Sequence, residues 1–219
     1  MLSVKNLSLS IQRVPILKNI SLDIESGSTC GLVGRNGAGK TTLMRAIMGV
    51  LPLEAGTIEF NHVDLHATKA HKRAALGIGY LPEDRKLVPH FTVDENIQVS
   101  LWATRNKDRS RVKWVYELIP EIGRFANRKA LTLSGGQQKL VALARALVAG
   151  TNLLLIDEPF EGVAPALAQR LMEVIADLKS EHLSVFVSES DYTHSRKVVD
   201  KVYSIERGQL RLMDIQEAA

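Results

Sequence analysis

The sequence is poor in cysteine, in aromatic residues and in long apolar runs, and each shortage excludes a class of protein. Among its 219 residues Cys30 is the single cysteine, which excludes an intramolecular disulfide framework and a zinc site built from cysteines alone. The most apolar stretch, residues 140–156, contains Arg145 and a polar break at residues 150–152, so it cannot cross a bilayer as one helix. Aromatic residues make up 5% of the chain, and none precedes Phe60.

The overall composition is that of an ordinary folded protein. Hydrophobic residues make up 45% and charged residues 24%, which excludes disorder and collagen-like repeats, and the length suits one domain with a sizeable core. The net charge of +4 comes without a long basic run, so nucleic acid is not expected as a partner. The first residues lack the continuous apolar core of a signal peptide, and we expect a cytoplasmic protein.

The hydrophobic pattern predicts alternating strands and helices. Apolar residues at period two or in short runs predict strands near residues 4–9, 20–24, 29–33, 57–60, 78–81, 153–156, 183–187 and 202–205. Helical spacing and two capping-box patterns, one at Thr92 and one at Ser134, predict helices near 41–50, 92–103, 111–119, 134–149, 165–178 and 192–199. The sequence therefore predicts one α/β unit over residues 1–219, with a core of 1–83 and 151–219 and a helical segment at 84–150.

A glycine-rich loop follows the strand expected at 29–33 and opens a helix, and it fits the phosphate-binding pattern G-x-x-x-x-G-K-[ST]. Its glycines let successive N–H groups turn toward phosphate oxygens, and the helix N-terminus adds a partial positive charge. Lys40 is expected to reach the β- and γ-phosphates, and the Thr41 hydroxyl to bind Mg²⁺. The predicted nucleotide-binding residues are Gly34, Arg35, Asn36, Gly37, Ala38, Gly39, Lys40, Thr41 and Thr42.

Two carboxylates end the most apolar strand. Four aliphatic residues, 153–156, lead into Asp157 and Glu158, and a buried parallel strand delivers such residues to the carboxyl edge of its sheet, where α/β ligand sites lie. Asp157 is expected to hold Mg²⁺, and Glu158 to polarise the water that attacks the γ-phosphate.

A further motif, Leu-Ser-Gly-Gly-Gln at residues 133–137, precedes the acidic strand by about fifteen residues. Ser134 caps a helix whose first N–H groups are exposed by two glycines, which makes a second anion-binding helix end. The order GxxxxGKT, LSGGQ, LLLIDEP resembles the ATP-binding subunits of ABC (ATP-binding cassette) transporters from residue 2 to about 212.

This resemblance implies a P-loop ATPase core with a mostly parallel sheet, an N-terminal antiparallel β subdomain and an inserted helical subdomain. It also implies a Mg²⁺-dependent ATPase in which two such chains pack head to tail, with each ATP between the P-loop of one and the 133–137 motif of the other. The residues expected to contact the partner's ATP are Ser134, Gly135, Gly136 and Gln137. The implied partners are transmembrane permease subunits, through which the chain sits on the inner face of the membrane.

A finer resemblance concerns the transported substance. Residues 79–85, 88–96, 115–120 and 157–165 are similar to the bacterial importers of branched-chain and other hydrophobic amino acids, and within them to the smaller of two unlike ATPase subunits. A heterodimer is therefore expected, and a homodimer stays open. Two other functions also stay open. One is a weakly hydrolysing regulatory subunit, and the other is a soluble ABC ATPase outside transport. Such soluble ATPases usually carry a second cassette, for which this chain has no room.

Four positions depart from the family pattern. Ile11 occupies the place of an aromatic that stacks on adenine, so a weaker adenine contact is expected. Glu83 replaces a glutamine and is still able to bind Mg²⁺. Ser190 stands at the place of a histidine that senses the γ-phosphate, and His194, four residues on, is expected on the surface. Ala164 replaces an aspartate that touches the partner.

Overall fold

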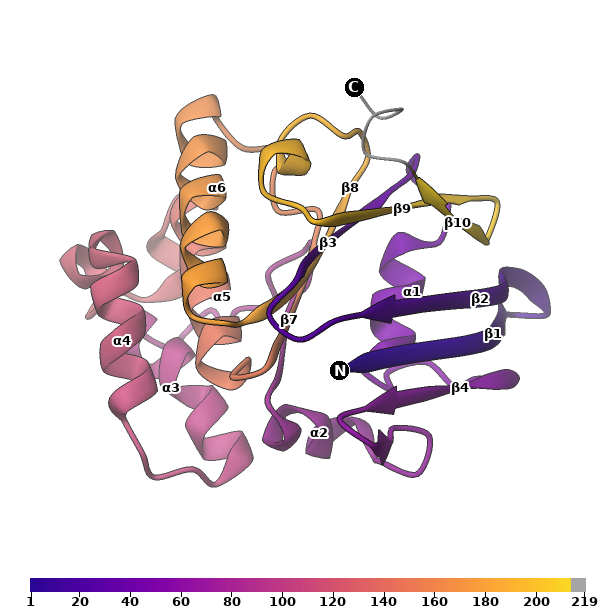
Figure 1. Ribbon diagram of the computed structural model, residues 1–219. Helices are drawn as coiled ribbons and strands as arrows, with labels where there is room; N and C mark the ends of the chain where they lie inside the picture. Colours follow the sequence, from indigo (N-terminus) through magenta and orange to yellow (C-terminus); the bar gives the residue numbers. More distant parts are fainter. Residues whose placement is uncertain (214–219) are drawn as a thin grey trace.

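Two β-sheets and a group of helices form the computed structural model, which describes residues 1–213 (Figure 1). The antiparallel sheet has the order β2-β1-β4-β5, with β1 (Leu2–Ile11), β2 (Val14–Ile24), β4 (Ala55–Phe60) and β5 (Val63–Asp64). The second sheet has the order β10-β9-β3-β8-β7-β6, with β3 (Thr29–Val33), β6 (Ile78–Leu81), β7 (Leu153–Asp157), β8 (Ser184–Glu189), β9 (Lys201–Glu206) and β10 (Gln209–Met213). Its pairs are parallel except β9 with β10, so the expected α/β fold is confirmed.

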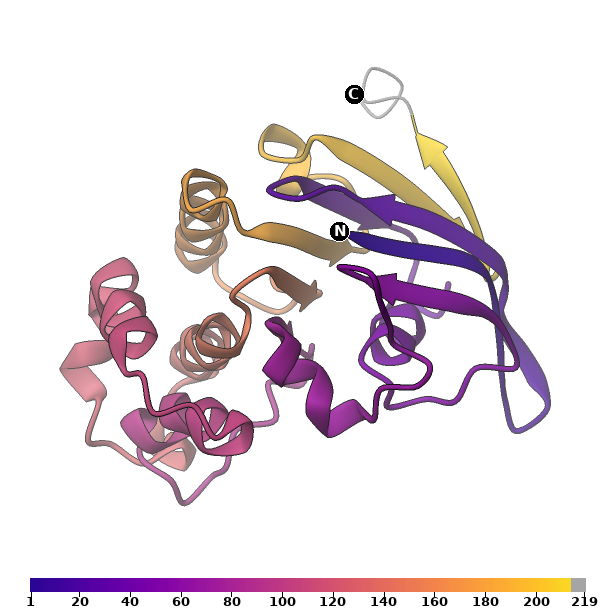
Figure 2. The same ribbon diagram turned by 60° about the horizontal axis from the view of Figure 1, so that its bottom comes forward.

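The α-helices are α1 (Lys40–Ile47), α2 (Ala70–Arg73), α3 (Val93–Thr104), α4 (Ser110–Leu118), α5 (Gly135–Ala149) and α6 (Pro165–Ser180). Both predicted capping boxes are present, with Thr92 and Glu95 at α3 and Ser134 and Gln137 at α5. Helices α3, α4 and α5 gather on the side of the molecule away from the antiparallel sheet (Figure 2). Within residues 1–213, no helix combines the length and the apolar character that a bilayer span requires.

The helix predicted at 192–199 is wrong, because this part of the chain forms only a short 3₁₀ turn, Ser195–Lys197. The buried carboxylate of Glu189, at the end of β8, accepts hydrogen bonds from the backbone N–H groups of His194 at 3.2 Å and Ser195 at 2.8 Å. These contacts fasten the start of the 3₁₀ turn to the end of β8. The last six residues of the predicted unit, 214–219, lie outside the described residues.

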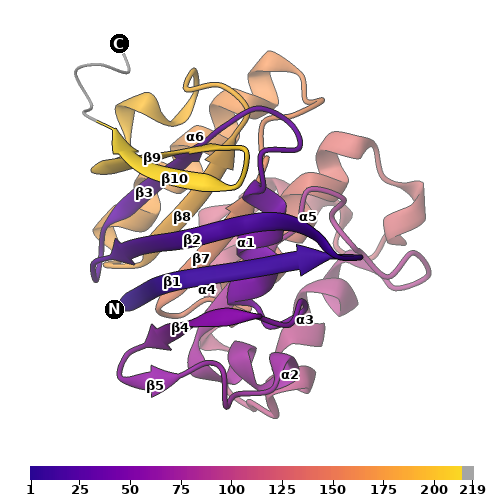
Figure 3. The same cartoon turned by 90° about the vertical axis from the view of Figure 1, so that its right-hand side faces the viewer.

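The central strands are buried on both faces, and their side chains alternate between two hydrophobic clusters. In β7, Leu153 and Leu155 pack with helix α1 and the antiparallel sheet, whereas Leu154 and Ile156 pack with α3, α5 and α6. Figure 3 shows α1 behind β1, β2 and β4, between the antiparallel sheet and the parallel one. A strand without a solvent face needs apolar residues at every position, which is why the run 153–156 has no polar member.

A buried arginine caps the end of the P-loop helix. The guanidinium of Arg73, on α2, donates to the carbonyl oxygens of Ala46 at 3.2 Å and Ile47 at 2.5 Å, the last residues of α1. It also donates to Thr68, and Gly49 leaves the space into which the guanidinium fits, since a Cβ there would lie 2.5 Å from Cζ. Helix α1 ends at Ile47, earlier than the predicted residue 50, because Gly49 has a left-handed φ of 69° and the N–H groups of Gly49 and Val50 turn back to the carbonyls of Ala46 and Arg45, both at 2.9 Å. Arg73 adds a side-chain donor to the last carbonyls of the helix.

We expect Arg73→Met to lower the free energy of unfolding by about 3 kcal/mol, because several buried carbonyls lose their donor together. The measurement is urea unfolding followed by circular dichroism. The matched control is Lys72→Met, which removes a charge from an exposed neighbour on the same helix and is expected to change stability by less than about 0.5 kcal/mol. Equal losses for the two variants would contradict the capping role of Arg73.

Candidate functional site

Three loops meet because three neighbouring parallel strands end at one edge of the sheet. Strand β8 lies between β3 and β7, with Val33 paired to Glu189 and Asp157 paired to Ser188. The residues that follow these strands are therefore side by side: the glycine-rich loop after β3, Glu158 after β7 and Ser190 after β8. This carboxyl edge is where ligands bind in open α/β sheets.

The glycine-rich loop requires glycine at two places for different reasons. A Cβ on Gly34 would lie 2.3 Å from the carbonyl oxygen of Ile205, so only glycine allows the loop to pass β9. Gly39 has φ 118°, a left-handed conformation that L side chains rarely adopt, and it precedes the first residue of α1. No side chain caps α1 and no acidic residue lies in its first turn, which leaves the N–H groups of that turn available to an anion.

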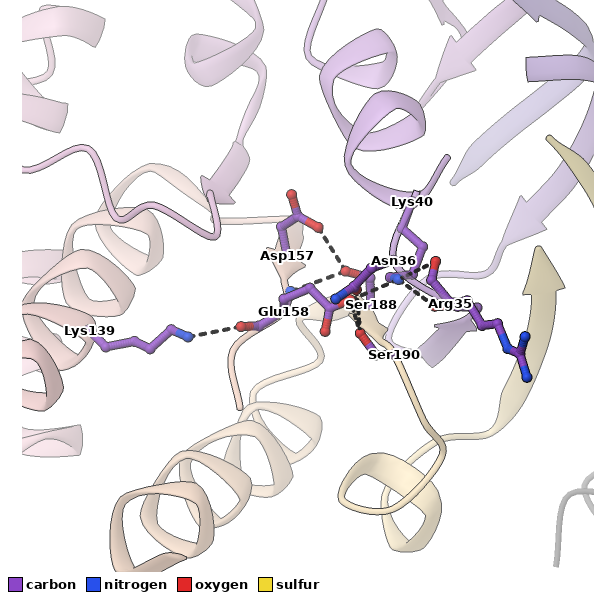
Figure 4. Close-up of polar contacts among 9 residues, drawn as sticks. Arg35, Asn36, Lys40, Lys139, Asp157, Glu158, Ser188 and Ser190 are labelled. Atoms are coloured by element: carbon purple, nitrogen blue, oxygen red, sulfur yellow. Dashed lines mark hydrogen bonds and ion pairs between the residues drawn. The ribbon is translucent and has the colours of Figure 1, made fainter. Parts of the chain in front are cut away.

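Lys40 lies inside this loop and joins it to the acidic strand end (Figure 4). Its ammonium forms an ion pair with Glu158 Oε1 at 2.9 Å, and the two side chains are only 4% and 6% exposed. It also donates to the carbonyl oxygens of Gly34 and, at 3.1 Å, of Arg35. The structure thus brings together two residues that the sequence analysis assigned to one site although they are 118 positions apart.

Asp157 is fully buried beside this pair. Burial raises the pKa of its carboxyl, and the hydroxyls of Ser188 and Thr41 lower it in part. Ser188 Oγ donates to Asp157 Oδ1 at 2.8 Å and accepts a hydrogen bond from the backbone N–H of Glu158 at 3.1 Å. Ser188 therefore orients both acidic residues, and no local motif marked it, since its place depends on its register opposite Asp157.

The oxygen atoms near Asp157 suit a magnesium ion. Partial burial raises the pKa of Glu83, and the carboxylates of Glu161, Asp157 and Glu158 raise it further, so several negative groups converge on one place. Carboxylate and hydroxyl oxygens are the ligands that Mg²⁺ takes in proteins, and a divalent cation relieves this repulsion. The predicted ligands Thr41, Glu83 and Asp157 fit such an ion by their chemistry.

Ser190, directly after β8, contacts the carboxylate of Glu158. Its hydroxyl is 2.9 Å from Glu158 Oε1 and 2.8 Å from Asn36 Oδ1 of the glycine-rich loop. His194, which was expected on the surface, is half-buried and stacks on Phe160 with ring centroids 4.6 Å apart. A cavity of about 270 Å³ has both Ser190 and His194 in its wall, together with Glu158.

A cavity of about 430 Å³ is lined by part of the predicted glycine-rich loop together with Glu83 and Glu158. Its apolar wall comes from Ile16 on β2, which sequence analysis did not single out. Ile11, the predicted adenine contact, is 41% exposed at the turn between β1 and β2 and does not line this cavity. The lining residues are Ile16, Asn36, Gly37, Gly39, Lys40, Thr41, Thr42, Glu83 and Glu158.

The 133–137 motif lies outside this cavity, at the start of α5. Ser134 Oγ accepts the N–H of Gln137 at 3.3 Å, and Gln137 Oε1 accepts the N–H of Ser134 at 3.0 Å. Ser134 and Gly135 are exposed, so this helix end faces outward rather than toward the chain's own glycine-rich loop.

A parallel sheet with a glycine-rich loop, its lysine and two acidic residues at one edge defines a P-loop nucleotide-binding protein. The ABC transporter family model matches residues 17–161, and the chain belongs to this family of ATP-binding cassette ATPases. It is 32% identical to the high-affinity branched-chain amino acid transport ATP-binding protein BraG of Pseudomonas aeruginosa, over 98% of this chain and 92% of that protein. It is also 32% identical to the lipopolysaccharide export ATP-binding protein LptB of Escherichia coli, over 95% of this chain and 88% of that one.

Solved cassettes have the same fold. The ADP conformation of the cassette MJ1267 superposes with a TM-score of 0.81 at 25% identity, covering 96% of this chain and 89% of that one. The cassette MJ0796, in a dimeric post-hydrolysis state bound to ADP and phosphate, superposes with a TM-score of 0.88 at 23% identity, covering 98% and 99%.

We expect Ser188→Ala to weaken the Mg²⁺-dependent binding of a fluorescent ADP analogue about tenfold, because Asp157 and the peptide of Glu158 lose their common partner. The measurement is a Mg²⁺ titration at fixed nucleotide concentration. Ser184→Ala is the control, since Ser184 is equally buried on β8 but bonds to Gly27 and Glu25, away from the site. Unchanged Mg²⁺ dependence in Ser188→Ala would show that Ser188 does not orient the site.

Proposed function

We propose that this ATPase binds ATP with Mg²⁺ at the carboxyl edge of its parallel sheet and hydrolyses it to drive an importer of branched-chain or other hydrophobic amino acids. The observation that carries the proposal is the buried contact of 2.9 Å between Lys40 and Glu158, which joins the phosphate-binding loop to the acidic strand end. At this distance the Lys40 ammonium is able to bind a phosphate group while the Glu158 carboxylate acts as a base beside it.

The glycine-rich loop is the phosphate site of this proposal. The N–H groups at the start of α1, from Gly39 to Thr42, bind the phosphate oxygens. Lys40 adds a positive charge that the carbonyls of Gly34 and Arg35 hold inside the loop. Thr41, Glu83 and Asp157 hold Mg²⁺, which neutralises phosphate charge when it is bound. Ile16 lines the same cavity and supplies apolar surface for the base. Ile11, exposed at the turn between β1 and β2 and outside this cavity, is proposed as a further apolar contact of the base.

Glu158 is the general base of this proposal. Its carboxylate accepts a proton from water as the water oxygen attacks the γ-phosphorus, and ADP and inorganic phosphate are the products. Its backbone φ of 47° is left-handed, a rare conformation for a residue other than glycine and one that is frequent at functional sites. Ser190, whose hydroxyl is 2.9 Å from Glu158 Oε1, is the proposed γ-phosphate contact, and its hydroxyl proton turns from the carboxylate to a phosphate oxygen when ATP binds.

A second ATPase chain completes the site. Residues Ser134, Gly135, Gly136 and Gln137 contact ATP bound to that partner, which is consistent with their exposed helix end and their absence from the chain's own cavity. We propose an unlike ATPase as the partner, as the resemblance to the smaller of two importer ATPases implies. Ala164 lacks the carboxylate expected at this interface, so an unlike partner is free to supply the missing polar contact.

Permease subunits form the transport pathway and hold the chain at the inner face of the membrane. The helical segment offers an apolar surface for them, where Trp102 and Leu131 are 54% and 50% exposed. Phe91 packs edge-on against Trp102 with ring centroids 6.1 Å apart, and its carbonyl oxygen accepts a hydrogen bond from the backbone N–H of Ala130, next to Leu131, at 2.9 Å. Exposed apolar groups clustered in this way are typical of protein interfaces.

We expect Glu158→Gln to reduce steady-state phosphate release about 100-fold or more while ATP still binds, because the amide cannot accept the proton. Glu161→Gln is the matched control, since it neutralises an exposed acid three residues along the same loop. Thermal unfolding of both variants checks that loss of the ion pair with Lys40 has not unfolded the chain. Equal rates for wild type and Glu158→Gln would contradict the assigned base.

The assignment of the cargo is tested by transport. In the organism that encodes this chain, deletion of its gene is expected to abolish high-affinity uptake of labelled leucine, isoleucine and valine, and the wild-type gene restores it whereas Glu158→Gln does not. The likeness to LptB makes export the competing function. Normal amino acid uptake with lipopolysaccharide retained in the inner membrane would refute the importer.

A further inference from the structure

Lys139 is a buried cation on α5 that makes no ion pair within residues 1–213. Its side chain is 4% exposed. Its ammonium donates instead to two backbone carbonyl oxygens, that of Glu158 at 2.9 Å (Figure 4) and that of Glu161 at 3.1 Å. Burial lowers the pKa of Lys139 and the positive charge of Arg85 lowers it further, whereas the carboxylates of Glu161, Glu83 and Glu158 raise it. Burying an ammonium costs free energy that its contacts with carbonyls and the nearby carboxylates offset.

The two carbonyls belong to the turn that carries the proposed base. The N–H of Glu161 reaches the carbonyl oxygen of Glu158 at 3.4 Å, which closes the turn over four residues. Glu158 itself has the left-handed φ of 47° that directs its carboxylate to Lys40. A left-handed conformation at a residue with a side chain persists only where its surroundings hold it.

Lys139 holds one side of Glu158, and Ser188 holds the other. Ser188 Oγ accepts the backbone N–H of Glu158 at 3.1 Å, and Lys139 takes its carbonyl. The two peptide groups that flank the Glu158 side chain are therefore fixed from different elements, β8 and α5. A shift of α5 relative to the sheet would turn the carbonyl that Lys139 holds while Ser188 keeps the N–H in place, and the carboxylate would rotate.

The same helix begins with the residues proposed to contact the partner's ATP. Lys139 is two residues beyond Gln137, about 3 Å along the axis at the usual rise of a helix, and both lie in the rigid α5. One short helix therefore links the outward-facing end at Ser134 to the backbone of Glu158 in the chain's own site.

We propose that Lys139 is a positioning residue for Glu158, and that it transmits the contact of α5 with the partner's nucleotide to the hydrolytic carboxylate of its own chain. This inference rests on the proposed function. Nucleotide at one site thereby sets the orientation of the base at the other, which makes hydrolysis at the two sites interdependent.

The test uses the complete ATPase complex with three variants. Lys139→Met, which removes the donors and keeps the length of the side chain, is expected to lower kcat by about ten- to a hundredfold with KM for ATP changed less than about twofold. Lys139→Arg restores donors and recovers most of the rate. Gln138→Met is the control, since the Gln138 side chain also donates to two carbonyls, those of Ala130 and Leu133, but on the other side of the helix start. The kcat of this variant is expected to stay within about twofold of wild type.

Single-turnover hydrolysis in a double variant separates positioning from general damage. If Lys139 acts through Glu158, then Lys139→Met causes no further loss in the Glu158→Gln background, because the group that it orients has gone. A kcat within twofold of wild type in Lys139→Met, or the same loss in both backgrounds, would overturn the proposal. Failure of the proposed function has a different signature, since Glu158→Gln alone would then keep its activity.

Hydrogen exchange gives a readout independent of turnover. The amide of Glu161 is expected to exchange at least about tenfold faster in Lys139→Met than in Gln138→Met, because the turn over residues 158–161 loses the ammonium that spans it. Unchanged protection of this amide would also overturn the proposal, since the turn would then hold its shape without Lys139.

Discussion

The site depends on the order of three strands. Because β8 runs between β3 and β7, in parallel with both, the chain must leave all three at one edge, and residues distant in sequence become neighbours there. The register then decides which atoms meet, since Ser188 lies opposite Asp157 and Glu189 opposite Val33. A slip of one residue would turn Ser188 to the other face of the sheet and replace its hydroxyl beside Asp157 with an apolar group.

Cationic side chains that bond to backbone carbonyls fix the loops around the site. Arg73 holds the end of α1 and Lys139 holds the turn after β7. Arg145, on α5, donates to the carbonyls of Arg85 at 2.6 Å and Lys86 at 2.7 Å, two consecutive residues with left-handed backbones. A hydrogen bond from a side chain to a backbone carbonyl fixes the path of the main chain itself, whereas an ion pair joins only the ends of two side chains. Such hydrogen bonds are therefore suited to loops without regular secondary structure.

The sequence predicted correctly those features of the structure that depend on interactions between neighbouring residues. The glycine-rich loop, both capping boxes and the strand at 153–156 depend on neighbouring residues, and they are present as predicted. The helix predicted at 192–199 is a 3₁₀ turn of three residues, and its start is bonded to the carboxylate of Glu189 on β8, a contact that no local pattern indicates. The sequence did not predict the roles of three further residues, Ile16, Ser188 and Lys139. Their contacts are determined by strand order and helix packing and not by a local motif.

The buried pair of Lys40 and Glu158 has a consequence for the end of each catalytic cycle. A buried charge that loses its partner costs several kcal/mol, and this cost would oppose the departure of phosphate from Lys40. Here the ammonium has the Glu158 carboxylate and two loop carbonyls within reach as substitutes. When phosphate leaves, the Lys40 ammonium exchanges its contact with phosphate for contacts with Glu158 and the loop carbonyls. Tight binding of phosphate by Lys40 therefore need not slow product release.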